Sequence, residues 1–173
     1  QDIPTRTLKN RIYETFLKIK KIIKSKNIDA LFCPAYEGGH QDHDVSNFIC
    51  SKLKRFCKIF EFSEYNFFDN KINCNLFFDK KVKPKIYFLT NEEKKFKKKC
   101  LKIYNSEKNN LNYINVEKES FRPLQRYNYC NPPHSGILFY RRFRFFSWHP
   151  RVDGDEPKSV CEIIKNSKIF NLV

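Results

Sequence analysis

The first third of the chain alternates between helical and extended hydrophobic patterns. Apolar residues recur three or four positions apart, the spacing of a helix that buries one face, at Leu8, Ile12, Phe16, Ile19 and Ile23. Residues 28–33 form a short apolar run without alternation, as expected of a strand covered on both faces. The helical spacing returns at Val45, Phe48, Ile49, Leu53 and Phe56. This order predicts a helix, a buried strand and another helix.

The rest of the chain predicts further short elements. Residues 59–62 read as a second strand of similar direction, and the run 63–88 as irregular chain or a hairpin that ends in a strand at 86–89. Thr90 and Glu93 form a capping-box pattern ahead of an amphipathic helix. An extended pattern crosses 138–146, and 160–164 suggests a short terminal helix. A succession of this kind is typical of an α/β fold with a doubly wound sheet.

Composition indicates a single folded domain. The 173 residues are 40% hydrophobic and 16% aromatic, which is enough for a core and argues against disorder. No internal repeat or linker divides the chain, so we expect one domain over residues 1–173. No apolar run approaches the roughly 18 residues of a membrane span. The seven cysteines are odd in number and form no Cys-x-x-Cys motif, which favours a reducing cytoplasm over a disulfide framework or a cysteine zinc site.

The formal net charge of +15 raises the question of nucleic acid, because clustered lysines and arginines neutralise phosphates. The lysines are instead scattered over nearly every segment, and no known nucleic-acid module is present. We therefore expect a solvated basic surface and no specific nucleic-acid partner. A non-enzymatic binding domain for nucleic acid or an anionic glycan is the alternative function.

The most chemically suggestive stretch is residues 36–44, Tyr-Glu-Gly-Gly-His-Gln-Asp-His-Asp. It falls at the predicted strand-to-helix turn, where α/β sheets bind ligands and the helix offers unpaired N–H groups. Imidazoles bind zinc, and carboxylates nearby can fix their tautomers. His40 and His43 are too few for the roughly three ligands of a catalytic zinc. Asp42 or Asp44 can be the third ligand or can cap the helix, and a polar capped turn with solvent-facing histidines is the alternative interpretation.

Residues 29–44 resemble the second signature of the PIG-L/LmbE family of zinc-dependent N-deacetylases. Four further landmarks are similar to those of family members, in the same order along most of the chain: 3–4, 89–93 with 104–106, 119–123 and 132–136. The resemblance implies a Rossmann-like three-layer α/β sandwich. It also implies Zn²⁺ as cofactor and hydrolysis of the acetyl group from an N-acetylglucosamine-containing substrate.

The sequence departs from the family in one respect. The first signature, His-Pro-Asp-Asp-Glu, supplies two metal ligands and the catalytic aspartate base in the family and is absent from this sequence. The chain begins with Gln1 and contains no Met, so we expect these residues to be the later part of a longer, N-terminally truncated domain. We also expect the 173 residues alone to bind zinc poorly and to lack deacetylase activity.

The resemblance assigns roles to single residues. His43 would be a metal ligand, His40 would stabilise the oxyanion and protonate the leaving amine as an imidazolium, and Asp42 would orient and charge His40. Arg122 and His134 could line the substrate cleft, the alternatives being a surface ion pair and a turn histidine. Further residues considered for sugar stacking are Trp148, which is more often a packing residue, and His149, which receives no role.

Overall fold

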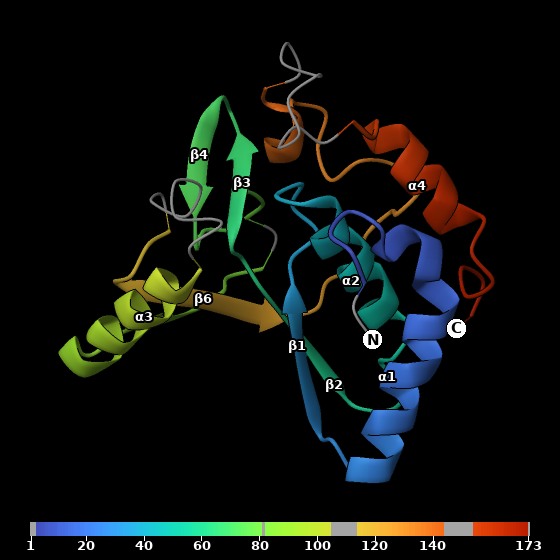
Figure 1. Cartoon of the computed structure of the whole chain (residues 1–173), viewed down its shortest axis with the longest axis horizontal. Coiled ribbons are helices and arrows are strands. Elements are labelled where there is room, and N and C mark those ends of the chain that lie inside the picture. The colour runs from blue at the N-terminus through green and yellow to red at the C-terminus, as the bar shows by residue number, and fades with distance from the viewer. Residues whose placement is uncertain (1–2, 81, 105–113, 144–153, 173) are drawn as a thin grey trace.

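The computed structural model describes residues 3–80, 82–104, 114–143 and 154–172. The chain opens with a 3-10 turn, η1 (Leu8–Arg11), and continues as helix α1 (Ile12–Lys26). Strand β1 (Ala30–Pro34), helix α2 (Gln41–Ser51) and strand β2 (Lys58–Phe62) follow. The predicted helix, strand, helix and strand are therefore all present, with boundaries shifted by a few residues (Figure 1).

Two strands then form a separate hairpin, which was one of the two predictions for this run. They are β3 (Tyr65–Phe68) and β4 (Lys71–Cys74), which pair antiparallel. The remaining elements are β5 (Lys85–Phe88), α3 (Asn91–Ile103), β6 (Lys118–Pro123), η3 (Phe139–Arg141) and α4 (Pro157–Lys165). The prediction that 138–146 is extended is wrong for its described part, because residues 139–141 form a 3-10 turn, and residues 144–146 lie outside the described residues.

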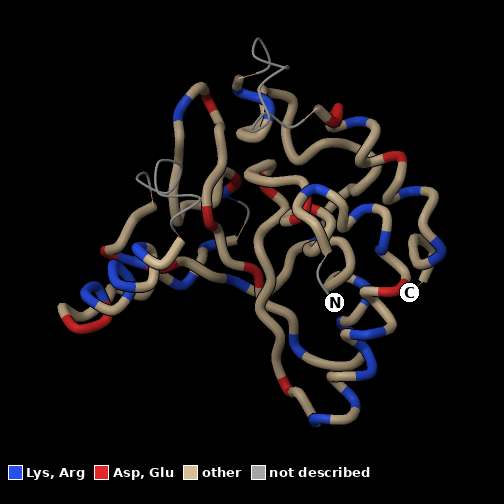
Figure 2. Tube along the Cα trace, viewed as in Figure 1, with Lys and Arg blue, Asp and Glu red and all other residues tan. Residues whose placement is uncertain are grey.

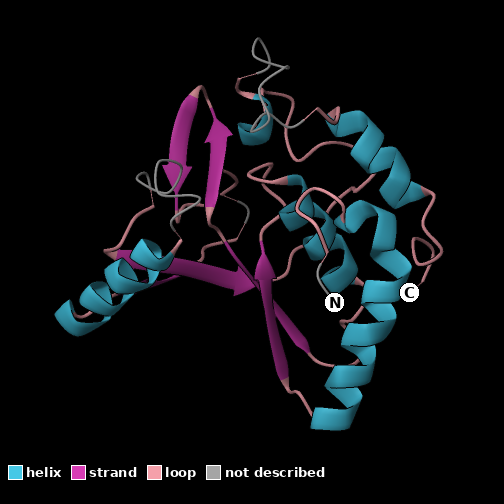
Figure 3. Cartoon of the chain, in the orientation of Figure 1, coloured by secondary structure: helices cyan, strands magenta, loops and turns pink. Residues whose placement is uncertain are grey.

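The main sheet has the strand order β1-β2-β6-β5. β1 and β2 are parallel and are joined through α2, with Leu31 opposite Ile59. β6 runs antiparallel to both β2 and β5. The protein is thus an α/β fold whose described sheet is mixed in direction, and only its β1–β2 pair has the parallel arrangement of a doubly wound sheet (Figure 3).

The hydrophobic core lies between the parallel strands and the helices. α2 packs against β1, α1 packs against α2, and α4 closes the far side of α2. The fully buried side chains at the centre are those predicted from helical spacing, Val45, Phe48, Ile49 and Leu53. These helices therefore hold the loop between β1 and α2 at a fixed position on the sheet.

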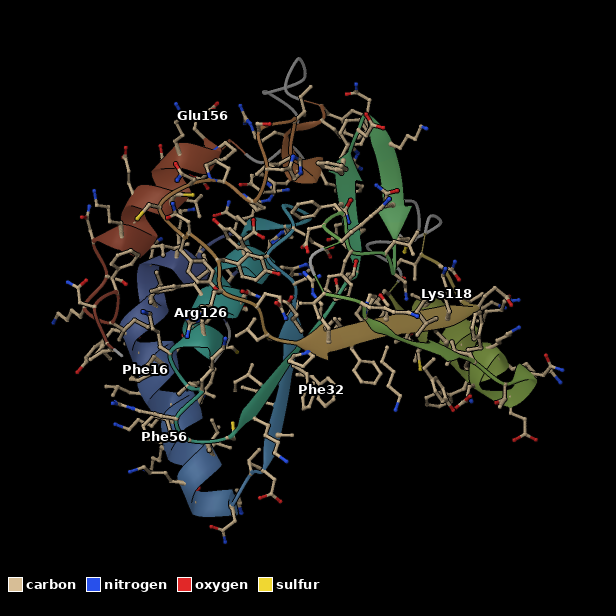
Figure 4. All side chains as sticks on the ribbon, turned by 180° about the vertical axis from the view of Figure 1, so that it is seen from behind. Phe16, Phe32, Phe56, Lys118, Arg126 and Glu156 are labelled. Atoms are coloured by element: carbon tan, nitrogen blue, oxygen red, sulfur yellow. The ribbon has the colours of Figure 1, made fainter. Side chains whose placement is uncertain are left out.

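The opposite face of the sheet differs from the expectation that residues 28–33 are covered on both sides. Phe32 on β1 is 52% exposed, and its ring stacks on Phe60 of β2 at 5.1 Å and meets Phe121 of β6 edge-on at 5.7 Å. Figure 4 shows Phe32 on the side of the strands away from α1. The alternating burial of β1 is that of a strand covered on one face.

The amphipathic helix α3 begins as predicted. Thr90 Oγ1 accepts a hydrogen bond from the backbone N–H of Glu93, and the Glu93 carboxylate accepts one of 2.8 Å from the backbone N–H of Thr90. The terminal helix α4 is also present and is longer than its predicted core. Both results rest on local signals, a reciprocal cap and an apolar stripe, which need no distant partner.

Two further findings concern the cysteines and the length of the helices. All seven cysteines are free thiols. Within the described ranges, no helix has the length together with the apolar character that a membrane crossing requires.

Candidate functional site

The loop of residues 35–40 leaves the carboxyl end of β1 and enters α2 (Figure 1). The helix begins at Gln41, and His40 is its N-cap: His40 Nδ1 accepts a hydrogen bond of 3.1 Å from the backbone N–H of Asp42. The prediction that Asp42 or Asp44 caps the helix is therefore wrong. The physical reason is that His40 has the extended backbone of a cap residue, whereas both aspartates already lie within the first helical turn.

The glycine pair lets the loop pass close to two other segments. A Cβ atom on Gly39 would lie 2.3 Å from the backbone oxygen of Tyr65 on β3. Gly38 has a φ of +70°, and its carbonyl accepts a hydrogen bond of 2.9 Å from the backbone N–H of Phe139. The loop is thus held between β3 and the start of η3, an approach that a side chain at position 39 would block.

Two buried carboxyl groups organise the loop from within. Glu37 is 2% exposed, and it accepts hydrogen bonds from the backbone N–H of Glu64 at 2.7 Å, from Ser63 Oγ at 2.8 Å and from Asn66 Nδ2 at 3.0 Å. Burial raises the pKa of Glu37 to about 7, although these three donors favour its charged form. Asp44 Oδ1 accepts 3.1 Å hydrogen bonds from the backbone N–H groups of residues 37 and 38, and burial raises its pKa too.

The two histidines lie side by side at the surface end of this arrangement. Their ring centroids are 5.3 Å apart. His43 Nδ1 is 3.4 Å from Glu64 Oε2, and burial lowers the pKa of His43 to about 4, so the imidazole is neutral at neutral pH. Because His40 Nδ1 accepts a hydrogen bond, a neutral His40 ring carries its proton on Nε2, which is 3.3 Å from Thr5 Oγ1.

Asp42 connects the loop to the entrance of the first helix. Its Oδ2 accepts a hydrogen bond of 2.6 Å from the backbone N–H of Arg6, and its Oδ1 accepts one of 3.2 Å from that of Leu8. The carboxylate is 3.8 Å from His40 Nδ1, which is ion-pair distance but beyond a hydrogen bond. Asp42 therefore lies beside His40 as expected, while its hydrogen bonds hold residues 6–8.

Arg122 on β6 lies inside the protein and is only 1% exposed. Its Nε donates to Glu61 at 2.8 Å, and its two terminal nitrogens donate to the Asp79 carboxylate at 2.9 and 2.6 Å. The last two N–H groups reach the Val82 carbonyl and Tyr127 Oη. All five donors of the guanidinium thus have protein partners. This geometry indicates a buried structural cluster, which differs from both an open substrate cleft and a surface ion pair.

His134 lies against the β3–β4 hairpin. Its Nδ1 accepts a hydrogen bond of 3.2 Å from the backbone N–H of Gly136, and its ring meets Phe68 and Phe78 edge-on. Its Nε2 is buried and finds no hydrogen-bond partner among the described residues. This placement matches the turn-histidine alternative. Trp148 and His149 lie outside the described residues.

The structure brings together His40, Asp42 and His43 and adds two residues that received no role from the sequence, Glu37 and Glu64. Glu37 stands within the quoted motif itself. Glu64 follows the second predicted strand, and the ends of parallel neighbouring strands meet at the same edge of a sheet. A search for charged residues just after 59–62 would have found it.

Whether this site can hold zinc depends on the side chains that could ligate it. Within the described part of the chain, no three His, Cys, Asp or Glu side chains gather as a possible metal-binding group. His43 fits one zinc position as a neutral imidazole, but zinc takes about four ligands, at least three of them from protein in known catalytic sites. The described residues therefore do not fit a complete zinc site.

Comparison with protein families, curated proteins and solved structures finds no match to this chain.

Proposed function

We propose that this chain carries one side of the active site of a metal-dependent hydrolase that removes the acetyl group from an N-acetylglucosamine-containing substrate. The observation that carries the proposal is that the rings of His40 and His43 lie together at the carboxyl end of β1, with their centroids 5.3 Å apart. Ligands bind at this edge in open α/β sheets. The parallel β1–β2 pair joined through α2 supports a Rossmann-like framework for the whole domain.

His43 is the residue proposed to bind the metal. Its imidazole is neutral because burial lowers its pKa to about 4, and a neutral imidazole is the form that ligates zinc. The remaining ligands would come from residues other than those described. Zinc, when bound, would polarise the amide carbonyl of the substrate.

His40 is proposed to handle the proton of the leaving amine. Its Nε2 holds a proton in the neutral ring, and the nearby Asp42 carboxylate, 3.8 Å from Nδ1, favours protonation of the second nitrogen. Protonation of Nδ1 would break the cap to the Asp42 backbone N–H. The cap therefore opposes the imidazolium that the carboxylate favours.

The alternative, a basic module that binds nucleic acid or an anionic glycan, has less support. Lysines and arginines occur along most of the described helices and loops (Figure 2). The densest group is on α3, where Lys94 and Lys97 pair with Glu117 and Glu119. These contacts neutralise part of the charge that a polyanion would need.

The test is acetate release by the full-length gene product from N-acetylglucosamine, a nucleotide-linked derivative and a short glycan oligomer. The proposal expects release that a chelator abolishes and added Zn²⁺ restores. Isolated residues 1–173 should remain inactive with Zn²⁺. Lack of release from all three substrates by zinc-loaded protein, together with salt-sensitive binding to heparin or single-stranded DNA, would favour the basic binding module.

We place the activity in the cytoplasm, which the seven free cysteines support.

A further inference from the structure

Helix α3 lies at one end of the molecule, away from the core that α1, α2 and α4 enclose (Figure 1). None of its thirteen residues is buried, although the helix is amphipathic. Phe96 is 69% exposed and Ile103 is 72% exposed. Amphipathic helices of globular proteins ordinarily turn their apolar stripe toward the core. Large apolar side chains exposed together therefore mark α3 as an interaction surface.

The lysines of α3 fall into two groups (Figure 2). Lys94 and Lys97 form ion pairs with Glu117 and Glu119, which hold the helix against the start of β6. The two acidic residues of the helix itself both stand in its first turn. The remaining four lysines are exposed, and within the described ranges none of them forms an ion pair: Lys95, Lys98, Lys99 and Lys102. The outer side of α3 thus carries positive charge that the described chain does not neutralise.

The exposed lysines and the exposed apolar side chains occupy adjoining strips of the helix surface. Lys99 comes three positions after Phe96 and four positions before Ile103, the separations at which side chains on a helix are neighbours. Lys95, Lys98 and Lys102 follow the same spacing and form a second row beside Lys99. Lysines on one side with large apolar residues on the other are typical of helices that lie in the plane of a membrane surface.

We propose that this outer face of α3 docks the protein on an anionic lipid bilayer. Phe96 and Ile103 enter the boundary between headgroups and acyl chains, while the four unpaired lysines contact the negative groups of the lipids. Clusters of about four to eight basic residues on an amphipathic helix suit such a surface, because each lysine is attracted by the negative potential of the leaflet. A nucleic acid also attracts lysines but offers no apolar layer to Ile103, so the observations favour the bilayer. The inference does not depend on the proposed hydrolase activity.

The test is co-sedimentation of the full-length gene product with lipid vesicles. Wild type should bind vesicles of equal parts phosphatidylcholine and phosphatidylserine in preference to phosphatidylcholine alone. Binding should weaken as NaCl rises from about 0.1 M to about 1 M, which shortens the Debye length from ~10 Å to ~3 Å. Lys95→Glu with Lys98→Glu should weaken binding at least about 30-fold, since each lysine near the surface contributes about fivefold.

The matched control is Lys18→Glu with Lys21→Glu, two exposed lysines of α1 at the same spacing. It changes the net charge by the same amount and should keep nearly the affinity of wild type. Equal binding of wild type to both kinds of vesicle would overturn the proposal. So would equal loss of affinity in the two double variants, because net charge and not the face of α3 would then control binding.

A second pair of substitutions separates the bilayer from other occupants of this face. Phe96→Gln with Ile103→Gln keeps good helix formers and should weaken vesicle binding at least about 10-fold, the contribution of one buried apolar side chain. Ile22→Gln on α1 is its control. If the double variant does not fold, as judged by circular dichroism, Phe96→Gln alone decides. Vesicle affinity unchanged by these substitutions would assign the face to a polyanion such as nucleic acid, and a dimer that they dissolve, without vesicle binding by wild type, would assign it to a second copy of the chain; either result overturns the proposal.

Discussion

His40 Nδ1 accepts a 3.1 Å hydrogen bond from the backbone N–H of Asp42, so the histidine of the proposed site is also the cap of helix α2. His40→Ala should therefore lower the free energy of unfolding by about 0.5–2 kcal/mol, the usual cost of removing a cap. His40→Asn should restore most of this stability, because asparagine is a strong N-cap, without restoring an imidazole. Urea denaturation of the three proteins measures the effect. Equal free energies of unfolding for wild type and His40→Ala would show that the cap does not stabilise the protein.

The buried guanidinium of Arg122 leads to a prediction about stability. Arg122→Met leaves the carboxylates of Glu61 and Asp79 without their partner, and breaking a buried ion pair in this way costs about 3–5 kcal/mol. Arg11→Gln, which removes an exposed ion pair with Glu14, is the control and should cost at most about 1 kcal/mol. Thermal and urea unfolding give both values. A raised KM at unchanged stability in Arg122→Met would instead indicate that Arg122 lines the substrate cleft.

Glu37 should make the folded protein sensitive to pH. Its pKa is raised from 4.5 to about 7 by burial, so the folded state retains a proton that the unfolded chain releases. The stabilising effect of this proton is complete below about pH 4.5, decreases as the pH rises, and is lost above about pH 7. Over this window wild type should lose about 3 kcal/mol relative to Glu37→Gln.

The measurement is the free energy of unfolding of both proteins between pH 4 and pH 8, with Glu14→Gln on the exposed face of α1 as control. Asp44 and Glu64 also have raised pKa values and interact electrostatically with Glu37, so the difference between wild type and Glu37→Gln reports Glu37 together with its coupling to these two carboxyl groups. A difference that is independent of pH, or that grows in favour of wild type as the pH rises, would refute this titration.

The exposed aromatic face of the sheet should make the protein prone to self-association. Phe32 is 52% exposed on an edge strand that carries no charged residue, and such edges are sites of aggregation. Phe32→Thr should reduce both the binding of an apolar dye and the concentration-dependent mass in light scattering. Ile22→Thr, at a side chain 47% exposed on α1, is the matched control. Identical behaviour of wild type and Phe32→Thr would show that this face is inert.

Local signals in the sequence predicted much of the fold. The helical spacing from Leu8 to Ile23 and from Val45 to Leu53 and the cap at Thr90 each depend on neighbours a few positions away. The pairing of β6 with β2 and β5 could not be predicted in this way, because strand partners are chosen over long distances along the chain. For the same reason the sequence showed neither the exposure of Phe32 nor the mixed direction of the sheet.

The candidate site was predictable in location and less so in its contacts. Residues 36–44 lie at a strand-to-helix turn as expected, because a buried strand precedes them and an amphipathic helix follows. The choice of His40 over Asp42 as the cap depends on where the chain leaves the extended conformation, after a glycine pair that β3 approaches closely. The ion pair from Arg122 to Glu61 joins positions 61 residues apart. Such a contact cannot be predicted from the chemistry of either residue alone.

The central claim is that His43 binds a metal and His40 does not. It is tested most directly by zinc content per polypeptide, measured beside the turnover of an N-acetylglucosamine substrate, in the full-length gene product and its His43→Ala and His40→Asn variants. His43→Ala should lose zinc and activity together. His40→Asn should retain zinc and the cap but lose roughly 10²- to 10³-fold in turnover, the cost of one oxyanion or acid group. Loss of zinc from His40→Asn with retention in His43→Ala would reverse the two roles, and full activity in both variants would reduce the loop to a capped turn.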